Sequence, residues 1–166
     1  MLRAEGLYGG PVAGLDLVLG EGLTVVTGEP ECGTTTLLRL LAGTQQPDRG
    51  TVSGATTVLL EAPPGTEWAR EDLVVGALGA PHLIGREMWA MSGGERQRAR
   101  LANALASPAE VLLLDEPLGL LDAAGRDLVL DALHADGRPV LMACKSDLTA
   151  LVVADQVLTM AGGRIS

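Results

Sequence analysis

The sequence predicts an α/β fold in which helices cover a parallel sheet. Three short runs rich in Val and Leu have the uninterrupted apolar character of buried parallel strands: residues 23–27, 111–114 and 140–144. Helical spacing follows the first run and recurs around residues 127–134, between the other two. Strands that alternate with helices form parallel sheets, and ligands bind beyond the carboxyl ends of their strands. Gly28, Asp115 and Lys145 fall at those ends.

The first half of the chain continues this pattern. The strand at residues 23–27 ends at Gly28, and a loop containing Gly and Pro follows it. Leucines with helical spacing then predict a helix over residues 35–42, which closes at Gly43. Residues 58–60, Val-Leu-Leu, indicate a further short strand.

The second half begins with a segment of helical character. We expect residues 63–107 to form a helical insertion that begins in a turn and whose second helix stops at Pro108. Residues 157–160 predict a last strand, and the glycines that follow favour a hairpin to residues 164–165. The whole chain, residues 1–166, is then one domain, with its core in residues 1–62 and 108–166.

Composition and charge exclude several classes of function. Apolar residues make up 47% of the chain, but no run reaches the roughly 18 residues that span a bilayer, and nothing at the N-terminus resembles a signal peptide. We therefore expect a cytoplasmic protein. The two cysteines, Cys32 and Cys144, are too few for a disulfide framework.

The net charge of −9 argues against a nucleic-acid partner. The one basic cluster, Arg96, Arg98 and Arg100, is expected to be a solvated helix face.

The loop after the first strand has the size of a phosphate-binding loop. Residues 28–36 are Gly-Glu-Pro-Glu-Cys-Gly-Thr-Thr-Thr. In the pattern G-x-x-x-x-G-K-[ST], backbone amides and a helix N-terminus surround phosphates. Gly28, Gly33 and Thr35 fit this pattern, whereas Thr34 occupies the position of the lysine. Taken alone, an ordinary strand-to-helix turn explains this loop better.

Residues 111–117, Val-Leu-Leu-Leu-Asp-Glu-Pro, bring two consecutive carboxylates to the end of a buried strand. This arrangement resembles a Walker B element, in which Asp115 would hold magnesium through water and Glu116 would orient an attacking water. An acidic loop after a core strand is the alternative, so the pattern is only moderately specific.

A third motif decides between these alternatives. Residues 91–98, Met-Ser-Gly-Gly-Glu-Arg-Gln-Arg, closely resemble the signature sequence of the ATP-binding cassette (ABC) family. Ser92 and Glu95 have the spacing of a capping box, which any well-capped helix can carry. Capping does not explain Gly93 and Gly94, because glycines weaken a helix. The resemblance covers essentially the whole chain and identifies it as similar to an ABC nucleotide-binding domain.

This resemblance implies a P-loop NTPase-like sheet with a short helical signature subdomain, and ATP and Mg²⁺ as cofactors. It implies nucleotide contacts from Tyr8, Gly28, Cys32, Gly33, Thr34, Thr35 and Thr36, with Tyr8 stacking on adenine. It implies magnesium contacts from Thr35, Asp115 and Glu61. It implies catalytic roles for Glu116 and Lys145. Residues of the signature and D-loop would act on the nucleotide of a second subunit: Ser92, Gly93, Gly94, Glu95 and Asp122.

Three positions depart from the family pattern. Glu31 replaces a glycine, Thr34 replaces the loop lysine, and Lys145 replaces the switch histidine that contacts the γ-phosphate. Loss of one charge-assisted hydrogen bond, roughly 1.5–3 kcal/mol, predicts weak ATP binding rather than none. We hypothesise that Lys145, the only lysine, restores the missing charge. A solvated lysine at a strand end is the simpler interpretation.

The family resemblance also implies a head-to-tail dimer with ATP between the subunits. The residues that would act on the partner's ATP all fit the family pattern. Of the residues that would act on the chain's own ATP, some fit the pattern and some depart from it. This favours an ATP-binding subunit of an ABC-type transport system, paired with a second ABC ATPase subunit and with an integral membrane permease at the inner face of the membrane. Two alternatives stay open: a self-sufficient homodimeric ATPase that uses Lys145, and a non-hydrolysing regulatory or scaffold module.

Overall fold

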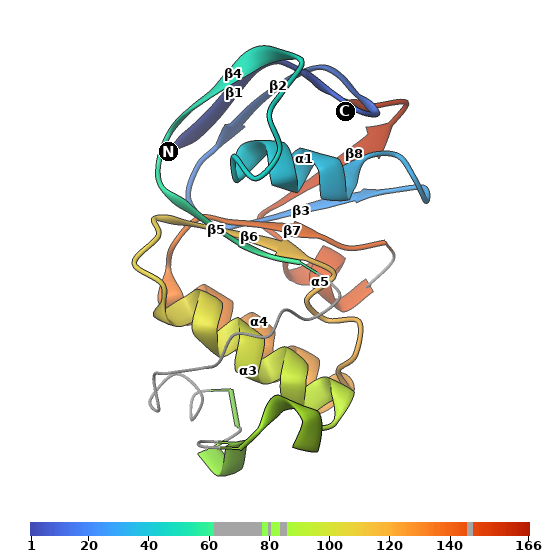
Figure 1. The fold of residues 1–166 in the computed structure, drawn as a ribbon. Coiled ribbons are helices and arrows are strands. Elements are labelled where there is room, and N and C mark those ends of the chain that lie inside the picture. The colour runs from blue at the N-terminus through green and yellow to red at the C-terminus, as the bar shows by residue number, and fades with distance from the viewer. Residues whose placement is uncertain (62–77, 80, 84–85, 146–147) are drawn as a thin grey trace.

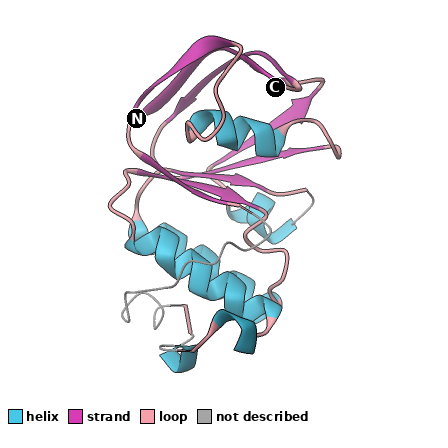
Figure 2. Ribbon diagram, viewed as in Figure 1, coloured by secondary structure: helices cyan, strands magenta, loops and turns pink. Residues whose placement is uncertain are grey.

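A computed structural model describes residues 1–61, 78–79, 81–83, 86–145 and 148–166 of the chain (Figure 1). The described residues form two sheets, one with six strands and one with three. Helices lie between the sheets and against the outer face of the larger sheet (Figure 2).

The larger sheet is the predicted parallel sheet. Its order is β5-β6-β7-β3-β8-β9, and every neighbouring pair up to β8 is parallel. The strands are β3 (Leu23–Gly28), β5 (Thr57–Leu60), β6 (Val111–Asp115), β7 (Val140–Ala143), β8 (Gln156–Ala161) and β9 (Arg164–Ile165). β8 and β9 pair antiparallel, which confirms the predicted C-terminal hairpin.

The smaller sheet is antiparallel and was not predicted from the sequence. Its order is β2-β1-β4, and it lies beyond α1 from the larger sheet (Figure 1). Its strands are β1 (Leu2–Gly9), β2 (Val12–Leu19) and β4 (Arg49–Gly54). The start of β2 contacts the turn between β8 and β9 of the larger sheet, because the amide of Ala13 donates a hydrogen bond to the carbonyl of Gly163.

The helices lie on both faces of the larger sheet. α1 (Thr34–Leu41) lies between the two sheets, and α3 (Gly93–Ala106), α4 (Ala123–Asp136) and the short α5 (Leu148–Val153) lie on the other side (Figure 2). Two short 3-10 helices, Pro81–Leu83 and Met88–Ala90, precede α3. None of the helices in the described ranges has the length and apolar character needed to cross a bilayer.

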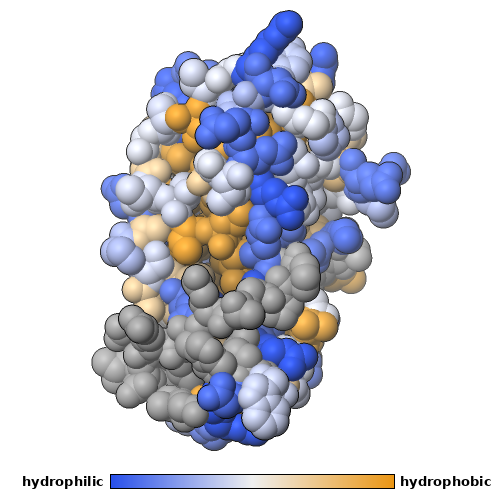
Figure 3. Space-filling view, viewed as in Figure 1, coloured by the Kyte–Doolittle hydropathy of each residue, from blue (hydrophilic) through white to orange (hydrophobic). Residues whose placement is uncertain are grey.

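Alternate residues of the central strands pack on opposite faces. Val25 and Leu112 belong to the apolar cluster under α3 and α4, whereas Val26 and Leu113 belong to the cluster with α1 and the smaller sheet. All four side chains are fully buried. A strand covered on both faces needs apolar residues at every position, which explains the uninterrupted runs in the sequence. On the face in Figure 3, hydrophobic surface gathers in the middle among hydrophilic residues.

One expectation from the sequence is wrong. Arg100 was expected on a solvated helix face, but it is only 7% exposed. Its guanidinium donates hydrogen bonds to the carbonyl oxygen of Glu61 and to Oε1 of Gln97. Burial lowers the pKa of this guanidinium. The position faces the sheet because α3 packs against β5, so the residue joins two elements instead of contacting solvent.

Much of the expected helical insertion at residues 63–107 lies outside the described residues. Its last helix is α3, which ends at Ala106 before Pro108, as predicted. The division of the chain into a core and an insertion stays a prediction.

Candidate nucleotide-binding site

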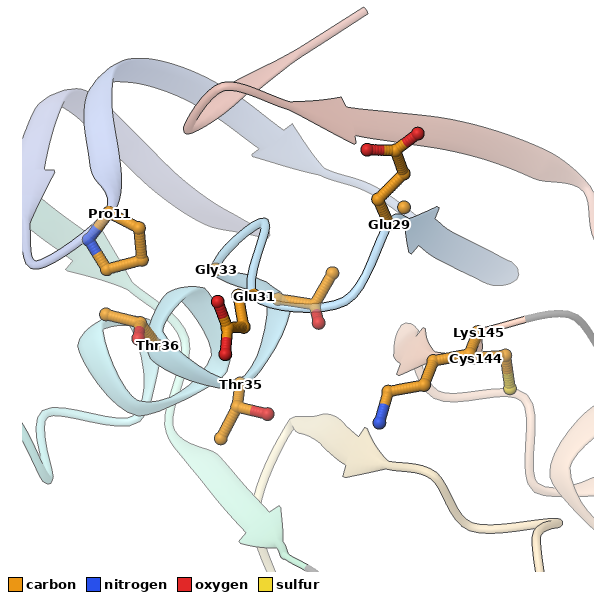
Figure 4. Close-up of a pocket in the computed structure, with 10 residues that line it drawn as sticks. Pro11, Glu29, Glu31, Gly33, Thr35, Thr36, Cys144 and Lys145 are labelled. Carbon is orange, nitrogen blue, oxygen red and sulfur yellow. The ribbon is translucent and has the colours of Figure 1, made fainter.

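Three strands of the larger sheet end at one edge, where a cavity of about 300 Å³ lies (Figure 4). β3 leads into the loop at Gly28, β6 ends at Asp115, and Lys145 follows β7. The parallel direction of these strands brings their carboxyl ends together. The cavity is lined by Pro11, Gly28, Glu29, Glu31, Gly33, Thr34, Thr35, Thr36, Cys144 and Lys145.

The N-terminus of α1 opens into this cavity without a side-chain cap. Gly33 is the N-cap residue, with a left-handed φ of 106°, and within the described part of the chain the helix has no side-chain cap hydrogen bond. The first intrahelical bond runs from the amide of Leu37 to the carbonyl of Gly33. The amides of Thr34, Thr35 and Thr36 therefore lack intrahelical partners. Uncapped amides at the positive end of a helix form an anion-binding site.

Close packing explains the first glycine of the loop. A Cβ on Gly28 would lie 2.3 Å from the carbonyl oxygen of Met160 and 2.6 Å from Sγ of Cys32. No larger residue fits without displacing backbone. Cys32 is one of the implied nucleotide contacts, and in this structure its amide donates to the carbonyl of Glu29 at 3.1 Å. This bond closes a turn within the loop, so that amide is directed away from a ligand.

Thr35 and Asp115 form a pair at the base of the cavity. Oγ1 of Thr35 donates to Oδ2 of Asp115 at 2.8 Å, and Asp115 is only 5% exposed. Burial raises the pKa of Asp115, while the Thr35 hydroxyl and the charge of Lys145 act in the opposite direction.

The chemistry of this pair fits magnesium. Hydroxyl and carboxylate oxygens are hard ligands, and Mg²⁺ commonly uses one or two protein oxygens together with water and phosphate. Among the described residues, no group of three or more His, Cys, Asp or Glu side chains is arranged to hold a metal alone.

Glu61, the third expected magnesium ligand, is engaged elsewhere in this structure. Its two carboxylate oxygens accept hydrogen bonds from Nε and Nη2 of Arg39 at 2.7 and 3.2 Å. Arg39 lies in the last turn of α1, so the ion pair joins that helix to the end of β5. A contact between Glu61 and magnesium would have to use the lone pairs that Arg39 does not occupy, or replace this ion pair.

Glu116 and Lys145 lie at adjacent strand ends. Glu116 adopts a left-handed φ of 48°, and its Oε1 accepts a hydrogen bond from the backbone amide of Lys145 at 3.1 Å. The carbonyl of Lys145 accepts from Oγ1 of Thr27 at 3.2 Å. Figure 4 shows the Lys145 side chain extending into the cavity toward Thr35.

Tyr8 lies on β1, and its side chain packs over β2. A Cβ on Gly14 would lie 2.7 Å from the Tyr8 hydroxyl oxygen. Tyr8 is 41% exposed and is not among the described residues that line the cavity. Pro11, in the turn just after β1, lines the cavity instead and packs against Gly33. The sequence analysis made no prediction for Pro11, because no motif includes it.

The N-terminus of α3 carries the predicted capping box. The hydroxyl of Ser92 accepts from the amide of Glu95 at 3.2 Å, and the carboxylate of Glu95 accepts from the amide of Ser92 at 2.7 Å. The backbone hydrogen bond from Ser92, its side-chain hydrogen bond and that of His82 lower the pKa of Glu95 to about 2. Neither residue is among the described residues that line the cavity of their own chain.

The two glycines of α3 pack beside the loop that follows β6. A Cβ on Gly94 would lie 3.0 Å from the carbonyl oxygen of Leu120, whereas one on Gly93 would meet only the Leu120 side chain at 3.6 Å. In the same loop, Asp122 caps α4 by accepting from the amide of Gly125 at 2.9 Å. Signature and D-loop residues therefore lie next to each other within one chain.

Solved structures share this fold. An ATP-binding cassette in a dimeric post-hydrolysis state with ADP and Pi has a TM-score of 0.87 and 14% identity, with 100% of this chain and 97% of that one covered. An ATP-binding subunit of an ABC transporter has a TM-score of 0.83 and 16% identity, with 99% and 88% covered.

Sequence comparison gives the family. The family model described as ABC transporter matches residues 66–119. An aliphatic sulfonates import ATP-binding protein of Paraburkholderia xenovorans is 37% identical, with 92% of this chain and 70% of the relative covered. The corresponding protein of Escherichia coli K12 is 34% identical, with 91% and 71% covered. One from Pseudomonas aeruginosa is 36% identical, with 66% of its length covered, so the chain spans about two thirds of such relatives. By this similarity, the chain belongs to the ABC transporter ATP-binding family.

Proposed function

We propose that this chain is an ATP-binding subunit of an ABC-type transport system and that it binds Mg-ATP in the cavity at the ends of β3, β6 and β7. The observation that carries the proposal is the uncapped N-terminus of α1 directly beside the Thr35–Asp115 pair. The amides supply hydrogen bonds to phosphate oxygens, and the hydroxyl and carboxylate supply oxygens toward Mg²⁺. Bound with ATP, the metal would neutralise phosphate charge, and the chain would hold it through these two residues.

A second subunit completes the site. The hydroxyl oxygen of Ser92 accepts from the amide of Glu95, and its hydrogen, which the Glu95 carboxylate accepts in this structure, would turn to donate to a phosphate. The amides of Gly93 and Gly94 lie in the first turn of α3 and have no intrahelical partners. These donors lie away from the cavity of their own chain, so the phosphate they contact belongs to the partner. The dimeric solved cassette with ADP and Pi supports this arrangement.

A membrane partner follows from the same proposal. The relatives are named as import proteins, and an import system needs a path through the bilayer, which no described helix of this chain provides. The partner is therefore an integral membrane permease, with this chain bound at its cytoplasmic face.

Hydrolysis by this chain alone is expected to be slow. Thr34 offers a backbone amide where the family has a lysine ammonium, so the loop itself makes no charge-assisted bond of this kind to the phosphates. Such a bond contributes about 1.5–3 kcal/mol. A partner with a complete loop would supply the faster site, and Ser92 of this chain would complete it.

A second candidate is a self-sufficient homodimeric ATPase. The position of Glu116 favours it, because its carboxylate lies at the end of β7 and accepts a hydrogen bond from the Lys145 amide. The third candidate, a non-hydrolysing regulatory or scaffold module, has no need of this carboxylate. Glu116→Gln separates the candidates, since it abolishes turnover by a homodimeric ATPase and leaves a scaffold unaffected.

A complementation assay tests the main proposal. The double variant Thr34→Lys, Ser92→Ala has the loop lysine and a defective signature, whereas the wild-type chain lacks the loop lysine and has an intact signature. We expect little phosphate release from either protein alone with Mg-ATP and a clear gain from the mixture. Sedimentation velocity would show ATP-dependent association in the same samples. A mixture no more active than the sum of its parts, despite association, contradicts the proposed role of Ser92.

A further inference from the structure

The cavity has an unusual charge for a phosphate site. Among the described residues that line it, the charged side chains are Glu29, Glu31 and Lys145. The carboxylate of Asp115 lies just below, against Thr35. Three carboxylates therefore face a single ammonium, and a triphosphate in this cavity has one lysine as its cationic partner. Because the loop has no lysine, this ammonium is the side-chain cation that the described lining of the cavity offers to the phosphates.

The backbone of Lys145 is fixed at the mouth of the cavity. Its amide donates to Oε1 of Glu116, and its carbonyl accepts from the hydroxyl of Thr27. These two bonds tie it to the end of β6 on one side and of β3 on the other. A side chain that starts from a fixed backbone loses less conformational freedom when it binds a ligand.

The ammonium of Lys145 is directed into the cavity. Figure 4 shows the side chain crossing from the end of β7 toward Thr35, the wall opposite its own strand. Among the described residues, the salt bridges do not include this ammonium. A phosphate held at the N-terminus of α1 would lie between the helix amides and this cation.

We propose that Lys145 is the phosphate-binding cation of this cavity and supplies, from the opposite wall, the charge that Thr34 lacks. The inference rests on the proposed function, because it requires the cavity to bind Mg-ATP. Since carboxylates outnumber the ammonium, the triphosphate enters as its magnesium complex, whose charge is lower than that of free ATP. Binding therefore depends on both the lysine and the metal.

Calorimetry on the full chain tests this assignment. Lys145→Met removes the charge and keeps most of the length of the side chain, and Lys145→Arg keeps the charge. We expect Lys145→Met to weaken Mg-ATP binding by about 10- to 100-fold, the worth of one charge-assisted bond. Lys145→Arg should recover most of the affinity. The matched control is Arg3→Met, which removes an exposed cation on β1, far from the cavity, and should leave the affinity unchanged.

The chain also allows a direct chemical test, because Lys145 is its only lysine. An amine-reactive reagent can modify the Lys145 ammonium and the α-amino group, and peptide mass spectrometry separates the two. Mg-ATP should slow the modification of Lys145 at least several-fold and leave the α-amino group unaffected. ATP with EDTA should give little protection.

The outcomes distinguish the inference from the function on which it rests. Wild-type binding with no loss in Lys145→Met, or with Lys145 modified equally fast in Mg-ATP, overturns the inference and leaves the proposed function standing. No wild-type binding at millimolar Mg-ATP overturns both. The inference is supported if Lys145→Met weakens Mg-ATP binding, the added change Thr34→Lys restores it, and Mg-ATP protects Lys145 in the wild type. One cation would then replace the other.

Discussion

The residue Glu31 should strain its own loop. Its φ of 67° lies in the left-handed region, where an L-residue with a Cβ costs roughly 1–2 kcal/mol and glycine costs nothing comparable. Glu31→Gly removes this cost but gives the unfolded chain more freedom, which lowers stability by about 0.5–1 kcal/mol. We therefore expect a net change in the free energy of unfolding between zero and about 1.5 kcal/mol in the stabilising direction.

A neighbouring glutamate provides the control. Among the described non-glycine residues, only Glu31 and Glu116 have positive φ, so Glu29→Gly carries the entropic loss without relief of strain. The difference between the two variants isolates the left-handed conformation and should be about 1–2 kcal/mol. Urea unfolding of both variants measures it. If Glu31→Gly is destabilised as much as Glu29→Gly, the loop is not strained at this residue.

The same position affects the ligand through its charge. Glu31 lines the cavity, so its carboxylate repels phosphate across a solvent-exposed gap. Removing one exposed charge should tighten Mg-ATP binding by about two- to five-fold. Glu31→Gln removes the charge and keeps the strain, so it should share the gain in affinity without the gain in stability. Calorimetry beside the urea series separates the two effects.

Three further changes test other parts of the account. Burial raises the pKa of Asp115, so the folded state holds this proton more tightly than the unfolded state does. Ionisation of Asp115 therefore destabilises the protein as the pH rises from the ordinary pKa of 3.8 through the raised pKa. Without nucleotide at pH 7, Asp115→Asn should therefore melt at a higher temperature than wild type, and this difference should disappear below pH 3.8. The same variant should lose Mg-dependent ATP binding. Gly94→Ala should be about 1 kcal/mol or more less stable than Gly93→Ala in urea unfolding, because only the former places a Cβ against a backbone carbonyl, at 3.0 Å. Ser92→Ala removes the cap of α3 and should cost about 1 kcal/mol, measured the same way.

The sequence predicted the larger sheet because its signals are local. Strands buried on both faces are continuous apolar runs, and here β3 ends at Gly28, β6 ends at Asp115 and Lys145 follows shortly after β7. Parallel order then implies that those ends share one edge, as the structure has them. The capping box of α3 was also predicted, since two residues, Ser92 and Glu95, suffice to specify it.

The smaller sheet was missed because the alternation of apolar residues in its strands is interrupted and because its strands pair across long separations in the sequence. The alternation of β1 shifts at Gly6, where φ is 54° and the pairing with β2 is irregular. β4 is mostly exposed and consists largely of small or polar residues, so it has no apolar pattern. Its pairing with β1 joins segments about 45 positions apart, as in Glu5 with Thr51. Only the folded chain brings such segments together.

The same limit applies to the site. The loop and the Asp-Glu pair follow from motifs, but the Arg39–Glu61 ion pair and the burial of Arg100 depend on how α1 and α3 pack against β5. Pro11 enters the cavity through a turn of the smaller sheet. No sequence pattern specified these contacts, because each joins elements whose relative position the motifs leave open.

The central claim is that the cavity beside Thr35 and Asp115 binds Mg-ATP. Calorimetric titration of Mg-ATP into wild type, Thr35→Val and Thr36→Val tests it most directly, since both variants lose one hydroxyl on adjacent residues that line the cavity. Only Thr35 contacts Asp115, at 2.8 Å. The account predicts measurable binding by wild type that Thr35→Val loses by at least ten-fold and Thr36→Val largely keeps. Absence of wild-type binding, or equal binding by Thr35→Val, would contradict it.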